Sequence, residues 1–278
     1  MASSGSGASD APPVFGSSKS ELQKERAEAK VPLPVVLAGA RKGVAGPKTT
    51  AASDEEEIAE LFPKTYGQGA ISFEAAAEPE VPDRPLRLGI VLSGGQAPGG
   101  HSVIAGVYDY VKSVSRDSKL YGFLGGPKGV FTGKYVEVTD EQMDAYRNMG
   151  GFDMICSGRD KIESAEHFKG ARDTAAALEL DGLLVAGGDD SNTNAAVLAE
   201  DFKANGSKTA VIGVPKTIDG DLKVHPHIPV SFGFDTACKV YSELAGNVAL
   251  DALSSRKYYH WIRLMGRAAS NITLEVAL

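Results

Sequence analysis

Cysteine is scarce in this sequence, and its scarcity excludes two kinds of structure. The 278 residues include only 2 cysteines, Cys156 and Cys238, which lie in neither a CxxC pair nor a Cys/His ligand spacing. Neither a disulfide framework nor a zinc site is therefore supported. This usage favours an intracellular, reducing compartment, and we expect a cytoplasmic protein.

Long apolar runs and an excess of positive charge are also missing. The longest apolar runs, such as residues 35–38, are far shorter than the ~20 residues that span a membrane. Lys and Arg number 29 against 36 Asp and Glu, which gives a formal net charge of -7. We therefore expect neither a nucleic acid nor a membrane partner, whereas a local basic pocket for a phosphorylated metabolite stays open.

The composition that is present, with 42% hydrophobic residues, is that of a globular protein. Residues 1–19, rich in Ser, Gly, Ala and Pro, are expected to be a disordered leader. A transit peptide is disfavoured because this segment has no arginine and contains Asp10. Residues 20–85 combine two short helices, starting near Ser20 and Ser53, with proline-fixed extended stretches. We expect this zone to be an N-terminal extension wrapped on a larger body.

From residue 86 onward, apolar strands alternate with helices. The expected strands cover residues 88–92, 182–186 and 209–214, and the expected helices cover residues 103–114 and 195–205. This alternation predicts an α/β fold with a doubly wound, mostly parallel sheet in a Rossmann-type, three-layer arrangement. Ligands of such sheets bind beyond the carboxyl ends of the strands. A polar, glycine-bearing turn follows each expected strand, so we expect the chemistry there.

The first of these turns is SGGQAPGG, at residues 93–100. Glycines let the backbone approach an anion closely, and the following helix offers free N–H groups. The spacing is neither GxGxxG nor GxxxxGK[ST], which disfavours an NAD-binding Rossmann module and a Walker loop. A simple tight turn remains the alternative interpretation.

The second turn is GGDDSNT, at residues 187–193. In one interpretation, Asp190 or Ser191 caps the following helix. In the other, Asp189 faces Mg²⁺, a hard cation that prefers oxygen ligands, within a phosphate site. Asp190 would then restrict which phosphoryl donor fits, because its carboxylate repels additional phosphate groups.

The third turn is PKTIDGD, at residues 215–221, and it is expected to be one loop. It is either a polar turn shaped by Asp and Gly, or a phosphoryl-transfer site. In the second interpretation Lys216 binds a phosphate, Thr217 binds a substrate oxygen, and Asp219 accepts the proton of an attacking hydroxyl. Because two further polar turns follow strands of the same sheet, the interpretation as a phosphoryl-transfer site is favoured over that of a polar turn.

A further strand is expected over residues 261–267, ending in Gly-Arg. Arg267 suits a phosphate or a developing charge because its fork is planar and always protonated, although it is equally compatible with a surface position. Lys257 and Tyr258 precede this strand and are also compatible with a solvated turn.

Five segments in this order resemble the phosphofructokinase family: SGGQAPGG, GGDDSN, PKTIDGDL, FGFDTA and MGRAAS. The sequence is most similar to the long-form, pyrophosphate-dependent branch, because residues 54–58 and 61–67 also resemble the N-terminal extension of that branch. ATP-dependent members usually carry glycine at the positions of Asp190 and Lys216. The resemblance therefore implies pyrophosphate as donor, with reversible phosphoryl transfer to the 1-hydroxyl of fructose 6-phosphate in glycolysis by an allosteric enzyme.

The resemblance also implies roles for single residues in the donor half of the site. Asp189 would hold Mg²⁺, while Asp190 and Lys216 would set donor choice and stabilise the transferring phosphoryl group. The residues implied to bind pyrophosphate are Gly95, Gly188 and Ser191.

In the acceptor half, the resemblance implies that Asp219 is the base for the 1-hydroxyl and that Arg267 is catalytic. The residues implied to contact fructose 6-phosphate are Thr217, Ile218, Asp219, Met265, Gly266 and Arg267. Lys257 and Tyr258 resemble a pair presented to the substrate of a neighbouring subunit, so a homodimer or hetero-oligomer is implied.

The resemblance divides the catalytic body unequally. Residues 86–255 would form the pyrophosphate- and Mg²⁺-binding domain, and residues 256–278 would begin an incomplete fructose 6-phosphate domain. Chains of the family continue well past the MGR segment, so we expect a truncated product or an incomplete gene model, with exposed apolar surface near its end. The alternative function is a non-catalytic or regulatory subunit that needs a full-length partner.

Overall fold

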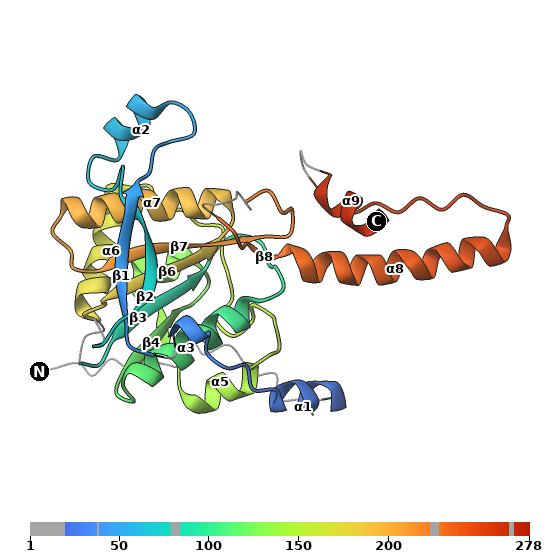
Figure 1. Ribbon diagram of the computed structural model, residues 1–278, viewed down its shortest axis with the longest axis horizontal. Helices are drawn as coiled ribbons and strands as arrows, with labels where there is room; N and C mark the ends of the chain where they lie inside the picture. The colour runs from blue at the N-terminus through green and yellow to red at the C-terminus, as the bar shows by residue number, and fades with distance from the viewer. Residues whose placement is uncertain (1–19, 38, 79–83, 223–227, 267–269) are drawn as a thin grey trace, which may run out of the picture.

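The computed structural model describes residues 20–37, 39–78, 84–222, 228–266 and 270–278. Its body is a six-stranded sheet with the order β5-β4-β3-β6-β7-β8 (Figure 1). The parallel strands are β3 (Arg87–Leu92), β4 (Lys119–Phe123), β6 (Gly182–Gly187), β7 (Ala210–Thr217) and β8 (Phe232–Gly233). β5 (Tyr135–Glu137) pairs with β4 in the antiparallel sense. The mostly parallel sheet that the sequence predicts is confirmed.

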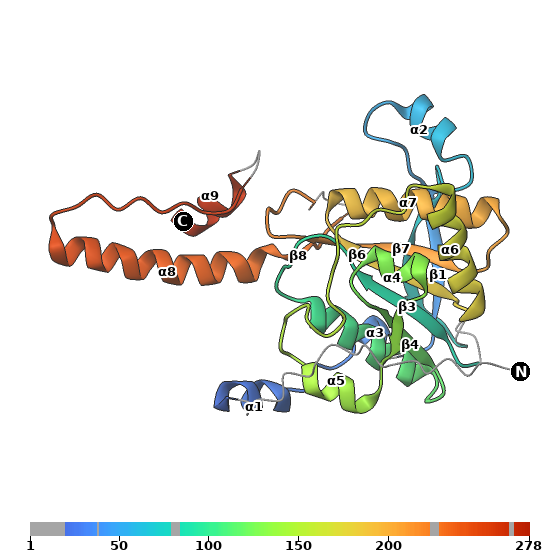
Figure 2. The same ribbon diagram turned by 180° about the vertical axis from the view of Figure 1, so that it is seen from behind.

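Helices cover both faces of this sheet (Figures 1 and 2). They are α3 (Gly100–Val114), α4 (Pro127–Thr132), α5 (Asp140–Tyr146), α6 (Ala165–Ala177) and α7 (Asp189–Ala204). Successive side chains of a strand point to opposite faces, and β3 follows this rule. Ile90 packs in a cluster with Ile104 of α3, whereas the adjacent Val91 packs in a second cluster with Leu198 of α7. The two hydrophobic cores confirm the three-layer arrangement.

The connections leave β3 and β6 in opposite directions. The chain passes from β3 through α3 to β4 on one side, and from β6 through α7 to β7 on the other. β3 and β6 are adjacent in the sheet, so their carboxyl ends flank a topological switch point. Ligands of doubly wound sheets bind at such a point.

The expected strands and helices agree with the structure to different degrees. The three expected strands form, and the helix expected over residues 103–114 begins slightly earlier, at Gly100. The helix expected over residues 195–205 begins at Asp189, directly after the second turn. The elements between residues 119 and 177 were not anticipated.

The N-terminal extension forms elements of its own. They are α1 (Glu21–Glu28), the short 3₁₀ helix η1 (Val35–Leu37), β1 (Arg41–Lys48), α2 (Glu55–Leu61) and β2 (Gly69–Ala75). β1 and β2 pair as a separate antiparallel sheet. Both expected helices form, although Asp54 before α2 has a positive φ of 54° and makes no side-chain cap. The Glu200 carboxylate on α7 accepts hydrogen bonds from the Lys64 N–H and the Thr65 hydroxyl, which anchors the extension to the body.

The C-terminal part projects from the sheet as an arm. α8 (Phe234–Ser255) leads away from β8, and α9 (Asn271–Ala277) packs back against it (Figures 1 and 2). The arm exposes large apolar side chains, including Trp261 at 94% and Tyr259 at 95% exposure. The expected exposure of apolar surface is confirmed.

The strand expected over residues 261–267 is wrong for its described part. Residues 261–266 have no regular secondary structure. A strand needs a partner for its backbone hydrogen bonds, and none of the described strands lies beside this segment. The last expected position, Arg267, lies outside the described residues.

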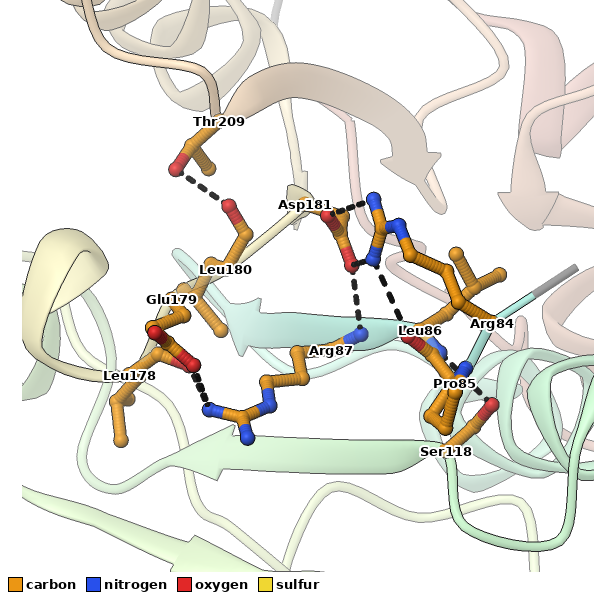
Figure 3. Close-up of polar contacts among 10 residues, drawn as sticks. All are labelled: Arg84, Pro85, Leu86, Arg87, Ser118, Leu178, Glu179, Leu180, Asp181 and Thr209. Carbon is orange, nitrogen blue, oxygen red and sulfur yellow. Dashed lines mark hydrogen bonds and ion pairs between the residues drawn. The ribbon is translucent and has the colours of Figure 1, made fainter. Parts of the chain in front are cut away.

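A polar network closes the amino-terminal edge of the sheet, opposite the glycine-rich turns (Figure 3). The Asp181 carboxylate accepts two hydrogen bonds from the Arg84 guanidinium, at 2.7 and 3.1 Å, and one from the Arg87 N–H. The Thr209 hydroxyl donates to the carbonyl of Leu180. The paired Arg84 side chain lowers the pKa of Asp181 below its ordinary value.

We expect the substitution Asp181→Ala to lower the free energy of unfolding by about 2–3 kcal/mol, because the Arg87 N–H loses its charged acceptor. Since the pKa of Asp181 is lowered on folding, its contribution is present above the ordinary aspartate pKa and is lost as the pH falls through the lowered value. Urea denaturation at neutral and acidic pH measures both effects. Glu179→Ala, which removes an exposed partner of Arg87, is the control and should cost less than about 1 kcal/mol. Equal effects of the two substitutions would contradict this account.

Candidate active site

The first glycine-rich turn joins β3 to α3. Gly94 and Gly99 have φ values of 85° and 115°, in the region that favours glycine. A Cβ on Gly99 would also lie only 2.9 Å from Cδ2 of Phe232. Ser93 is 4% exposed, and its N–H donates to the carbonyl of Ala186 on the neighbouring strand β6. The turn therefore contacts the neighbouring strand β6 and, farther along the sheet, β8.

The second turn places two carboxylates at the beginning of a helix. Asp189 and Asp190 are exposed and occupy the first turn of α7, whose N-cap is Gly188. No side chain caps this helix, so the interpretation of Asp190 or Ser191 as its cap is wrong: the helix begins before them. The acidic pair lies at the positive end of the helix dipole.

The third motif is divided between a strand and a loop, rather than forming one loop. Lys216 and Thr217 are the last residues of β7, where they pair with Phe232 and Gly233 of β8. This additional ladder carries the strand beyond Pro215. Both side chains are buried, at 7% and 8% exposure. Asp219 follows in the loop, half-buried, and its N–H donates to the Thr217 hydroxyl oxygen at 2.9 Å.

The three turns meet at the switch point. Lys216 Nζ donates to the carbonyl oxygen of Gly95 at 2.7 Å, which joins the third turn to the first. Ser191 Oγ donates to Ser93 Oγ at 2.8 Å, which joins the second turn to the first. A Cβ built on Gly94 would lie 3.8 Å from both Lys216 Nζ and Ser191 Oγ. Residues separated by more than 120 positions thus form one polar cluster.

The electrostatics of this cluster centre on Lys216. Its burial lowers the pKa of the ammonium, and the positive charge of Arg159 lowers it further. The carboxylates of Asp219 and Asp189 act in the opposite direction. Burial and a second cation both disfavour the charged form of a lysine, so a bound anion would stabilise the Lys216 ammonium.

Arg159 is a residue of this cluster that the sequence reasoning missed. The loop before it is held by the Gly94 N–H, which donates to the carbonyl of Gly158 at 2.9 Å. Arg159 Nη2 lies 3.3 Å from where a Cβ of Gly95 would stand. Farther along the loop, Lys161 Nζ lies 3.7 Å from Asp190 Oδ1.

One sequence signal could have led to this loop. Gly125 and Gly126 form a glycine turn directly after β4, and both have positive φ values. A side chain on Gly126 would collide with the backbone of Gly158. The turn after β4 therefore supports the loop that carries Arg159.

Comparisons with known proteins show the family of this chain. The profile of the family described as Phosphofructokinase matches residues 87–278. The chain belongs to the phosphofructokinase family. The pyrophosphate–fructose 6-phosphate 1-phosphotransferase subunit beta of Solanum tuberosum is 58% identical over 260 residues, which cover 93% of this chain and 46% of that protein. The pyrophosphate–fructose 6-phosphate 1-phosphotransferase of Treponema pallidum (strain Nichols) is 54% identical over 271 residues, covering 92% and 47% respectively.

Solved structures show the same fold. The pyrophosphate-dependent phosphofructokinase from Marinobacter aquaeolei superimposes with a TM-score of 0.60 at 22% identity, covering 69% of this chain and 48% of that one. The enzyme of the same name from Nitrosospira multiformis also gives 0.60, at 21% identity, covering 70% and 49%. The phosphofructokinase fold is thereby established. This chain spans slightly less than half the length of the curated relatives it matches.

Several residues expected in the phosphofructokinase site are not brought to the cluster. Lys257 and Tyr258 follow the far end of α8, which at ~1.5 Å per residue places them roughly 30 Å from its start. They are exposed, and Lys257 Nζ lies 5.2 Å from the Tyr258 ring centroid. Met265 and Gly266 are likewise exposed, on the irregular segment before α9. Ile218 and Gly188, by contrast, are half-buried beside Lys216 and Thr217.

The donor set of the site bears on the expected metal. Among the described residues, no group of three or more His, Cys, Asp or Glu side chains is placed to hold an ion. Mg²⁺ characteristically takes one or two carboxylates, water and substrate phosphates. The exposed carboxylate of Asp189, close enough to raise the pKa of Lys216, is a donor of this kind.

Among the residues that the structure describes, no helix is both long and apolar enough to cross a membrane.

Proposed function

We propose that this chain takes part in the reversible transfer of a phosphoryl group from pyrophosphate to the 1-hydroxyl of fructose 6-phosphate, which yields fructose 1,6-bisphosphate and phosphate in glycolysis. The observation that carries the proposal is the 2.7 Å hydrogen bond from Lys216 Nζ to Gly95, which unites the strand-end motifs around a buried cation. The names of the relatives from Solanum tuberosum and Treponema pallidum support the same substrates.

In the donor half, Lys216 lies where it can contact phosphate oxygens and stabilise the transferring group. Backbone groups of Gly95 and Gly188 and the hydroxyl of Ser191 bind pyrophosphate in this proposal. Asp189 holds Mg²⁺, which when bound neutralises part of the charge on the phosphate oxygens. Its support is the exposed position of that carboxylate at the start of α7.

In the acceptor half, Asp219 accepts the proton of the 1-hydroxyl as this oxygen attacks phosphorus. The Thr217 hydroxyl, which accepts a hydrogen bond from the Asp219 N–H, holds the loop in position. The residues proposed to contact the sugar phosphate are Thr217, Ile218, Asp219, Met265, Gly266 and Arg267. Arg267 is proposed to act on the developing charge.

The proposed organisation follows the same division. Residues 1–19 are a leader and residues 20–85 an extension. Residues 86–255 bind pyrophosphate and Mg²⁺, and residues 256–278 begin the fructose 6-phosphate domain. Lys257 and Tyr258, remote from their own cluster, serve the substrate of another subunit in a homodimer or hetero-oligomer. We propose a cytoplasmic, allosteric enzyme.

The test is an assay of Mg²⁺-dependent fructose 1,6-bisphosphate formation with pyrophosphate and, separately, with ATP. Pyrophosphate should be the better donor, and omission of Mg²⁺ should abolish turnover. Faster turnover with ATP would overturn the donor assignment.

A second candidate is a non-catalytic or regulatory subunit that needs a full-length partner. It is favoured by the distance of Lys257 and Tyr258 from the polar cluster, and relatives named subunit alpha and subunit beta exist in Solanum tuberosum. Gel filtration of the chain, alone and with a full-length relative, followed by assay of each fraction, separates the candidates. An active monomer would refute this one.

Donor choice gives a prediction for Asp190. Asp190→Gly should reduce the preference for pyrophosphate over ATP by about tenfold or more, since a carboxylate no longer repels the additional phosphate. Competition binding of the two donors measures the ratio. Asp190→Asn keeps the size and removes the charge, so it shows how much of the effect is electrostatic. An unchanged ratio in both variants would contradict the role of Asp190.

A further inference from the structure

A buried histidine lies just behind the first glycine-rich turn. His101 is the second residue of α3, and its side chain is 1% exposed. Its Nδ1 accepts the N–H of Gly151 at 3.1 Å and its Nε2 accepts the N–H of Met154 at 3.3 Å. Nε2 also lies 3.2 Å from Asp153 Oδ1. Both ring nitrogens therefore face one loop, at residues 148–159, which joins α5 to the polar cluster.

The backbone adds further links between this loop and the glycine-rich turn. The Gly99 N–H donates to the carbonyl of Gly150 at 2.7 Å, and the His101 N–H donates to that of Gly151 at 2.9 Å. A side chain on Gly100 would collide with the ring of Phe152. The imidazole thus completes a tightly packed junction.

The far end of the same loop reaches the polar cluster. Gly158 accepts the N–H of Gly94, and Arg159 places its guanidinium beside Gly95 and close enough to lower the pKa of Lys216. The loop that His101 contacts at its beginning therefore carries Arg159 at its end.

The contacts favour the neutral form of His101. A neutral imidazole keeps one ring nitrogen that can accept a backbone N–H, from Gly151 or from Met154, whereas the imidazolium can accept neither. In the imidazolium, an N–H on each ring nitrogen would face these two backbone N–H groups and break both hydrogen bonds.

The surroundings of the ring favour the neutral form. Burial lowers the pKa of His101, and Asp153 opposes this shift. The ring centroid of Tyr146, the last residue of α5, lies 5.0 Å from that of His101, and burial raises the pKa of Tyr146. The next residue, Arg147, forms an ion pair with Asp109 of α3 at 2.8 Å. A group with a lowered folded-state pKa contributes its full stabilisation above its ordinary value, 6.5, and loses it as the pH falls below.

We propose that His101, in its neutral form, is a positioning residue for phosphate recognition: it seats the loop of residues 148–159 so that Arg159 and Lys216 act on one anion. Protonation of His101 releases the loop and weakens anion binding in acid. The phosphate character of the anion rests on the proposed function, whereas the seating of the loop does not.

The test compares His101→Asn, whose amide oxygen can accept the Gly151 N–H at any pH, with His101→Leu, which cannot. The probe is pyrophosphate with Mg²⁺, titrated calorimetrically into the full chain between pH 5.5 and 7.5. At pH 7.5, the Leu variant should bind at least about tenfold more weakly, and the Asn variant within about threefold of the unmodified chain. Protonation of the probe affects both proteins equally, so it cancels in the ratio of the affinity of the unmodified chain to that of the Asn variant. This ratio should decrease as the pH is lowered from 7.5 to 5.5.

His167→Asn is the matched control, since His167 lies on α6 and stacks on Phe131 away from this loop. It should leave the affinity and its pH profile unchanged. Thermal unfolding of each variant checks that it is folded. Equal affinity of the Leu and Asn variants, or a ratio that stays constant with pH, would overturn the proposal.

Hydrogen exchange separates this proposal from the proposed function. The amides of Gly94 and Gly151 should exchange faster in the Leu variant and normally in the Asn variant, whether or not any anion binds. A chain that binds no pyrophosphate but shows this exchange pattern would refute the proposed function and retain the seating role of His101. Unchanged exchange in the Leu variant would refute the seating role.

Discussion

Lys216→Met should lower the affinity for pyrophosphate by at least about a hundredfold, because it removes the buried ammonium that we propose contacts the anion. Lys216 is 7% exposed and its Nζ already donates to the Gly95 carbonyl. Methionine keeps the apolar stem, and losing a buried charge does not by itself destabilise a fold. Calorimetric titration with pyrophosphate and Mg²⁺ measures the loss.

Lys203→Met is the control, since this exposed lysine lies in the last turn of α7. It should leave the affinity unchanged. Lys216→Arg should rescue poorly, because a planar fork cannot replace a compact ammonium in a buried position. The lowered pKa of Lys216 adds a pH effect: affinity in the unmodified chain should decline with rising pH earlier than an ordinary lysine would cause. Retention of full affinity by Lys216→Met would show that the anion binds elsewhere.

Asp219→Asn should reduce fructose 1,6-bisphosphate formation by about 10²–10⁴-fold, the range that removal of a general base produces. Asparagine has the shape of aspartate, and the hydrogen bond from the backbone N–H of residue 219 to Thr217 does not involve the side chain. Pyrophosphate affinity should therefore change by less than about threefold. A coupled assay of the chain, alone and in complex with a full-length relative, measures turnover.

Asp221→Asn provides a matched control two residues farther along the same loop, where the side chain is exposed. Its turnover should stay within about twofold of the unmodified chain. If Asp219→Asn turns over as fast as Asp221→Asn, a different group accepts the proton of the hydroxyl.

The part of the fold that the sequence predicted is the part with continuous apolar runs. β3 and β6 lie at the centre of the sheet and are covered on both faces, which is why their residues are apolar without alternation. β4, with the sequence KLYGF, is short and contains a glycine, and β5 has only 3 residues. Their formation depends on pairing with neighbours and leaves little local signal.

The part of the candidate site that the sequence predicted is likewise the part that follows or ends the apolar strands. Gly95, Ser191 and Lys216 each follow or end an apolar strand, so the parallel topology brings them together. Arg159 follows no such strand, and long-range hydrogen bonds of its loop bring it to the cluster. The position of Lys216 within β7 also depends on a distant partner, β8.

The projecting arm of α8 and α9 affects how this molecule behaves in gel filtration. Because a 22-residue helix extends from a rounded body, the molecule has more frictional drag than a compact sphere of the same mass. A single copy of this chain will therefore elute from a gel-filtration column ahead of a sphere of 29.1 kDa and will imitate a larger assembly. Light scattering at the column outlet reports mass independently of shape, so it gives the subunit number that elution volume would overstate.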